Sequence, residues 1–138
     1  MPRIGLGLGL GQFSGGGGSA FIGLLDTYPN AAAAYSVRLL RTAYTGSAIR
    51  VRRSSDNAEQ DIGFVSGSLD TSSLTSFCGA GNGFVTTWYD QSGNGNNATQ
   101  TTAANQPQIV SSGNVLTTNG KPSAQFDGTN DFLLYNSN

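Results

Sequence analysis

Short stretches of apolar and β-forming residues run along most of the chain, and each is bounded by Gly, Asn or Pro. In residues 48–53, Ile49 and Val51 alternate with arginines, which predicts a half-buried strand with a basic outer face. Residues 84–90, FVTTWYD, favour a strand throughout. Further short strands are expected at residues 61–65, 107–110, 115–117, 123–127 and 132–135. This spacing predicts an all-β sandwich or barrel.

One segment, residues 30–44, has a helical pattern instead. Asn30 is a preferred N-cap residue, four alanines follow it, and Leu40 and Tyr44 fall on one face. We therefore predict a single N-terminal α-helix there. Only a short helical or turn segment is expected over residues 70–77.

The first 23 residues have a different pattern. Aliphatic residues alternate with glycines, which gives an extended arm with one apolar face and one bare backbone face. The aliphatic residues of this arm are Ile4, Leu6, Leu8 and Leu10. We predict that residues 1–23 form a docking arm and linker and that residues 24–138 form a β-sandwich domain. The alternatives for the arm are a disordered tail or a signal peptide.

Composition restricts the chemistry. The chain of 138 residues has no histidine, which removes the usual general base, the usual zinc ligand and the Ser-His-Asp triad. Catalysis would have to use carboxylates, and no spacing singles out a pair among the eight acids. The net charge of -1 argues against nucleic acid or an anionic membrane as partner. Cys78, the single cysteine, is expected to be buried, and no cofactor is expected.

The sequence DQSGNG, which begins at Asp90, imitates the first half of a calcium loop. Thr101 stands where the bidentate acid of such a loop belongs, so we predict no metal. We expect a structural turn in which Asp90 and Asn94 accept hydrogen bonds from nearby amides. Gly93 and Gly95 are expected to take positive φ.

Trp88 and Tyr89 are consecutive, so their rings face opposite sides of a strand. One ring is expected to fill the core, and the other is free to stack on a sugar. With Asp90 and Asn94 nearby, these residues form a tentative glycan-binding site. The DGTND sequence at residues 127–131 is expected to be a surface turn. The acids at 56, 59 and 61 are expected to pair with the neighbouring arginines.

Two blocks of sequence resemble the N-terminal part of the catalytic domain of fungal α-L-arabinofuranosidase B, a concanavalin-like jelly roll. They are AAAAYSVRLLRTAYTGSAIRVRRSSDNAEQDIGF at residues 31–64 and LTSFCGAGNGFVTTWYDQSGNGNNATQ at residues 74–100. Similar blocks occur in phage and bacterial surface proteins with lectin-like or laminin-G-like domains. The resemblance implies a two-sheet β-sandwich, or part of one. In the enzyme the nucleophile and acid lie in the later half of the domain, so the resemblance carries over no catalytic residue.

From these features we expect a structural or adhesive phage protein, such as a tail, fibre or capsid decoration component, and not an enzyme. It would be located in the virion, anchored by its arm, with other virion structural proteins and further copies of itself as partners. Assembly would cover the sheet edge that an incomplete jelly roll exposes. The alternatives are an extracellular module that binds cell-surface glycan and a glycosidase whose second half lies outside this sequence.

Overall fold

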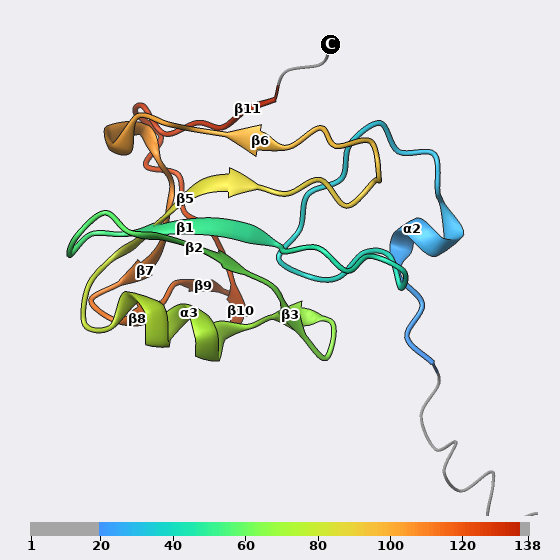
Figure 1. Cartoon of the computed structure of the whole chain (residues 1–138), viewed down its shortest axis with the longest axis horizontal. Coiled ribbons are helices and arrows are strands. Elements are labelled where there is room, and N and C mark those ends of the chain that lie inside the picture. The colour runs from blue at the N-terminus through green and yellow to red at the C-terminus, as the bar shows by residue number, and fades with distance from the viewer. Residues whose placement is uncertain (1–19, 136–138) are drawn as a thin grey trace, which may run out of the picture.

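The computed structural model describes residues 20–135, so the predicted docking residues Ile4, Leu6, Leu8 and Leu10 lie outside the described part of the chain. An antiparallel sheet of seven strands dominates the fold, in the order β11-β6-β5-β1-β2, with β7 pairing with β5 and β8 (Figure 1). Its strands are β1 (Ile49–Arg53), β2 (Glu59–Ile62), β5 (Gly83–Trp88), β6 (Ala98–Thr99), β7 (Gln108–Ser111), β8 (Asn114–Val115) and β11 (Leu134–Tyr135). Two small hairpins accompany it, β3 (Phe64–Val65) with β4 (Ser68–Leu69) and β9 (Thr117–Thr118) with β10 (Lys121–Pro122). The helical elements are α2 (Leu24–Thr27), α3 (Thr71–Cys78) and the 3-10 turn η1 (Ala103–Asn105).

The alternation in β1 determines which face of the sheet is buried. Ile49 and Val51 are fully buried, whereas the arginines between and after them are partly exposed. On the outer face Arg50 binds Asp61 at 2.8 Å, whereas Arg53, whose guanidinium lies over the Phe77 ring of α3, binds Asp56 at 2.7 Å. The predicted strand is confirmed, and the predicted pairing with arginines is confirmed for Asp56 and Asp61 but not for Glu59, whose side chain accepts from the Thr86 hydroxyl at 3.5 Å.

The core lies between the sheet and α3, which packs beneath the strands in Figure 1. Asp70 caps α3 by accepting a hydrogen bond from the amide of Ser73 at 3.0 Å. Leu74 and Cys78 face the sheet, and a Cβ on Gly83 would lie 2.7 Å from the Cys78 sulfur. Glycine in β5 therefore allows the helix to approach closely. The short helical segment and the burial of Cys78 are as predicted.

The helix predicted over residues 30–44 is wrong, because this segment is irregular and extended. Its backbone groups bond to other parts of the chain: the amide of Leu39 donates to the carbonyl of Gly67, and the carbonyl of Leu40 accepts from Leu25. These tertiary bonds outweigh the helical propensity of the alanines. Within residues 20–135 the first helix is the single turn of α2, just before this segment.

The remaining β structure follows the expected class with local differences. Residues 123–127 do not form a strand and contribute only an isolated bridge from Gln125 to Gln108. The turn at 127–131 is confirmed, since the Asp127 carboxylate accepts from the amides of Thr129 and Asn130. A curled antiparallel sheet with few helices agrees with the predicted concanavalin-like jelly roll. No helix within residues 20–135 is long and apolar enough to cross a membrane.

Candidate functional site

The loop that follows β5 lies beside the extended segment 30–41, at the end of the sheet nearest α2 (Figure 1). Asp90 joins the two. Its Oδ1 accepts from the amides of Ala34 and Ser92, both at 2.8 Å, and its Oδ2 accepts from the Ser92 hydroxyl at 2.7 Å and the Asn96 amide at 3.0 Å. We call residues 90–97 the Asp90 latch. Because Asp90 is only 4% exposed, its carboxylate is a buried acceptor shared by two separate segments.

Gln91 makes a second set of connections to the same segment. Its side chain is fully buried, and its Oε1 accepts from the Leu40 amide at 2.8 Å. Its Nε2 donates to the carbonyls of Ser36 at 3.1 Å and Arg38 at 2.9 Å. One side chain therefore satisfies three backbone groups, one amide and two carbonyls, that a helix over these residues would have paired internally.

The glycines of the latch have the backbone conformation expected from the sequence. Gly93 has φ +98° and Gly95 has φ +77°, a region that favours glycine. Asn94 differs from expectation, because its amide nitrogen donates to the carbonyls of Ala31 and Ala32, both at 3.0 Å. Its side chain is thus a donor to the segment, where an acceptor from nearby amides was predicted.

The electrostatics of the latch favour an ionised carboxylate. Burial by itself raises the pKa of Asp90, but hydrogen bonds from the hydroxyl and amide of Ser92 and the amides of Ala34 and Asn96 outweigh it, so the pKa lies below its usual value. Both carboxylate oxygens are occupied by these donors. This geometry supports a structural role for Asp90.

Trp88 and Tyr89 lie on opposite sides of the sheet end, as expected. Trp88 packs against the core, and its buried indole nitrogen has no hydrogen-bond partner among residues 20–135. The Tyr89 hydroxyl donates to Asp61 at 2.7 Å. Burial, together with this bond, raises the pKa of Tyr89 to about 12. The glycan-binding role of Trp88, Tyr89, Asp90 and Asn94 stays a prediction.

The eight acids of the chain bear on whether it could hydrolyse a glycoside by itself. A glycosidase needs one protonated carboxyl group beside one ionised carboxylate. Six of the acids have a pKa below the usual value because they accept hydrogen bonds. They are Asp26, Asp56, Asp61, Asp70, Asp90 and Asp127. None of these six has the raised pKa that a general acid requires.

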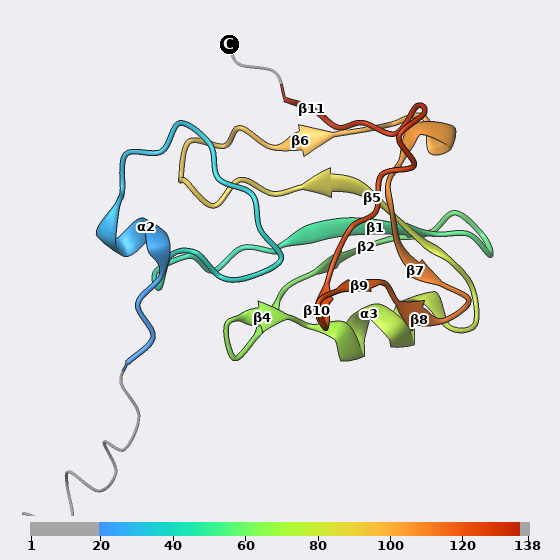
Figure 2. The same ribbon diagram turned by 180° about the vertical axis from the view of Figure 1, so that it is seen from behind.

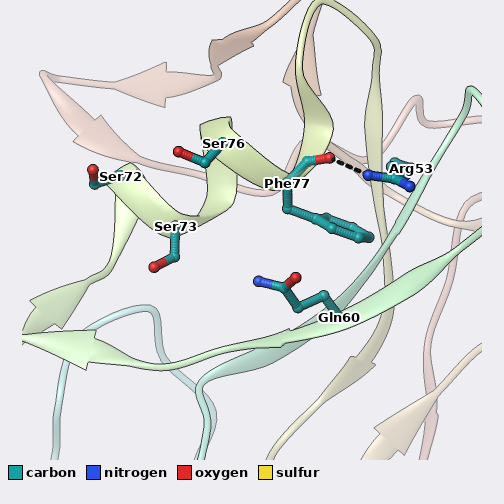
Figure 3. A pocket seen from close by; sticks show the side chains of 6 residues that line it. All are labelled: Arg53, Gln60, Ser72, Ser73, Ser76 and Phe77. Carbon is teal, nitrogen blue, oxygen red and sulfur yellow. Dashed lines mark hydrogen bonds between the residues drawn. The ribbon is translucent and has the colours of Figure 1, made fainter.

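A shallow pocket of about 400 Å³ lies between α3 and β2 (Figure 3). Arg53 lines it, but its guanidinium lies 4.9 Å from the Phe77 ring centroid, donates to the Phe77 carbonyl at 3.0 Å and binds Asp56. The other lining residues are Gln60, Ser72, Ser73 and Ser76. Sequence reasoning missed this pocket because it joins residues distant in the sequence. It offers hydroxyl and amide groups for a small polar molecule, and no carboxylate lines it.

Comparison with known proteins agrees with the sequence resemblance. The family model described as "Alpha-L-arabinofuranosidase B, catalytic" matches residues 25–132, which include the Asp90 latch and most of the sheet. The α-L-arabinofuranosidase B of Aspergillus oryzae is 42% identical over 74 residues, which are 52% of this chain and 15% of that protein. An α-L-arabinofuranosidase of Hypocrea jecorina is 40% identical over 73 residues, again 15% of its length. The chain thus spans about 15% of the length of these relatives.

Solved structures of arabinofuranosidases have the same fold over part of the chain. A mutant of a GH54 α-L-arabinofuranosidase soaked with 4-nitrophenyl α-L-arabinofuranoside matches with a TM-score of 0.58 and 29% identity, over 64% of this chain and 22% of that one. An arabinofuranosidase complexed with arabinofuranosyl-α-1,2-xylobiose matches with a TM-score of 0.51 and 30% identity, over 56% of this chain and 19% of that one.

These matches correct the functional expectations. The phage structural role, the virion location and the assignment as a non-enzyme are wrong, because the relatives and the structural neighbours are arabinofuranosidases, the relatives from fungi. The matches do not favour an independent carbohydrate-binding module either. The resemblance to the arabinofuranosidase B domain is confirmed, whereas the phage context has no support. With the family model matched over residues 25–132, the chain belongs to the family of the α-L-arabinofuranosidase B catalytic domain.

Proposed function

We propose that this chain is the scaffold-forming N-terminal part of an α-L-arabinofuranosidase catalytic domain, and that the complete domain hydrolyses α-L-arabinofuranosides. The observation that carries the proposal is the family-model match over residues 25–132. Within that span the Asp90 latch and the buried face of β1 and β5 fix the shape of the sheet. The chain's part in the reaction is to hold this sheet in place.

The state of the acids supports a scaffold role for the chain. The six acids whose pKa is lowered serve as helix cap, turn acceptor, latch or ion-pair partner. A group held ionised by several donors cannot protonate a leaving sugar near neutral pH. These six acids are therefore not candidates for the general acid, which we expect from the remainder of the domain.

A chimera tests the proposal. Residues 25–132 of this chain replace the matching segment of the Aspergillus oryzae enzyme, and release of 4-nitrophenol from 4-nitrophenyl α-L-arabinofuranoside is measured. We expect the chimera to hydrolyse the substrate and the 138-residue chain alone to show no activity above the blank. A matched chimera with Asp90→Ala should unfold at a lower urea concentration than the unaltered chimera and lose its activity over the same range of urea. A folded chimera without activity would refute the proposal.

A further inference from the structure

One amide side chain of the Asp90 latch donates nothing to the segment that the latch holds. Asn94 and Asn96 each donate from Nδ2 to a backbone carbonyl of segment 30–41, at 3.0 Å and 2.7 Å. Asn97, the last residue of the latch, uses only its oxygen, which accepts from the Asp90 amide at 3.0 Å. Among residues 20–135 its Nδ2 donates no hydrogen bond, and the residue is exposed. This nitrogen is therefore open to a partner from solution.

The sequence around Asn97 is a second, independent observation. Asn97, Ala98 and Thr99 form an Asn-x-Ser/Thr sequence without proline at the middle position, and the 138 residues contain no other sequence of this kind. Such a sequence is the acceptor for N-linked glycosylation in surface loops of secreted proteins. Ala98 and Thr99 form β6, and Asn97 lies in the loop just before it. The acceptor sequence and the open nitrogen thus coincide at one residue.

The place of Asn97 in the fold directs an attached group away from the core. Figure 2 shows β6 and the loop that leads into it on the side of the sheet away from α3, whereas the core lies between the sheet and α3. Ala98 is buried and its neighbour Asn97 is exposed, as expected where successive side chains of a strand point to opposite faces. A glycan on Asn97 would therefore project from the surface.

Glycosylation of Asn97 is also compatible with the latch. The linkage forms at Nδ2 and leaves Oδ1 unchanged, so Oδ1 keeps both of its lone pairs as acceptors. The bond from the Asp90 amide can then remain in place. The modified residue would still contribute its one hydrogen bond to the latch.

We propose that Asn97 is an acceptor for an N-linked glycan, with a lipid-diphosphate-linked oligosaccharide of the secretory pathway as co-reactant. Nδ2 of Asn97 forms a bond to the anomeric carbon of the first sugar, the bond from that carbon to the lipid diphosphate breaks, and Nδ2 loses one proton. The relatives from Aspergillus oryzae and Hypocrea jecorina come from fungi, which as eukaryotes have this pathway. The inference goes beyond the proposed function, because it requires no catalysis by the chain.

Expression in yeast tests the acceptor. The full chain is placed behind a yeast secretion signal, and the glycan on the total chain, from cells and medium together, is measured by peptide mass spectrometry. Peptide N-glycosidase F converts a glycosylated asparagine into aspartate, which identifies the residue that carried the glycan. Thr99→Ala removes the acceptor sequence, and Thr99→Ser is the matched control because it keeps the hydroxyl. Asn96→Gln is a second control, because it changes the latch and leaves the acceptor sequence intact.

We expect a glycan at Asn97 in the unaltered chain, in Thr99→Ser and in Asn96→Gln, and none in Thr99→Ala. An unaltered chain without a glycan at Asn97, or a glycan that persists in Thr99→Ala, would overturn the proposal. The glycosylated chain should also unfold at the same urea midpoint as the unglycosylated chain produced in bacteria, because the bond to the Asp90 amide is retained. A lower midpoint for the glycosylated chain would show that the glycan does not fit this fold and would equally overturn the proposal.

Discussion

Replacing Asp90 by alanine removes the acceptor at the centre of the Asp90 latch. The carboxylate accepts four hydrogen bonds, two of them from the buried amide and hydroxyl of Ser92. A buried donor left without a partner costs about 1–3 kcal/mol. The two Ser92 donors together would cost about 2–6 kcal/mol. The Ser92 hydroxyl also lies 3.4 Å from the Ala32 carbonyl, which offers it another acceptor, so we expect a cost in the lower half of that range. We therefore expect a loss of about 3 kcal/mol in the free energy of unfolding.

Urea unfolding followed by circular dichroism measures this loss. A loss of about 3 kcal/mol is a large fraction of the stability of a typical domain, and it should lower the urea midpoint by about 1–3 M without a change in slope. Asp56→Ala is the control, because it removes an exposed carboxylate that pairs with Arg53 on the surface and should shift the midpoint far less. An Asp90→Ala protein that unfolds at the original midpoint with the original slope would refute the structural role of the latch.

Four further outcomes follow from the same structure. Gln91→Ala should speed hydrogen exchange at the Leu40 amide, which bonds to the Gln91 side chain, without affecting β1. Because the pKa of Asp90 is lower in the folded protein than in the unfolded chain, ionised Asp90 stabilises the fold above about pH 4. This stabilisation is lost as the pH falls through the folded-state pKa. Asp90→Asn should therefore make the free energy of unfolding less dependent on pH in the acid range. With the Tyr89 pKa at about 12 in the folded protein, the neutral Tyr89 hydroxyl stabilises the fold below about pH 10, and this stabilisation is lost between about pH 10 and pH 12. Tyr89→Phe should therefore make the free energy of unfolding less dependent on pH in the alkaline range. Leu74→Ala should cost about 2–5 kcal/mol in urea unfolding, because Leu74 is fully buried between α3 and the sheet.

The elements that could be predicted from the sequence are those whose side-chain pattern is local. Alternation in residues 48–53 and the β-forming run at 84–90 lead directly to β1 and β5, the two strands at the centre of the sheet. Positive φ at Gly93 and Gly95 follows from the turn chemistry alone. Such features depend on neighbours in the sequence, so propensity and periodicity suffice.

The features that could not be predicted depend on partners distant in the sequence. The alanines after Asn30 favour a helix, but Gln91 and Gly67 bond to the backbone of that segment from more than 25 residues away. No local signal reports such partners, and they also reverse the role of Asn94 from acceptor to donor. The expected virion role was wrong because it depended on the Gly-Leu arm at residues 4–10, which lies outside the family match over residues 25–132.

The central claim is that residues 25–132 form an interchangeable scaffold of an α-L-arabinofuranosidase catalytic domain. The value of kcat/KM for 4-nitrophenyl α-L-arabinofuranoside, measured on the chimera beside its Aspergillus oryzae parent, tests it most directly. We predict a value within about two orders of magnitude of the parent, since a misplaced scaffold costs rate through the geometry of the site. A chimera that folds with the parent's circular dichroism spectrum and does not exceed the blank rate would contradict the claim.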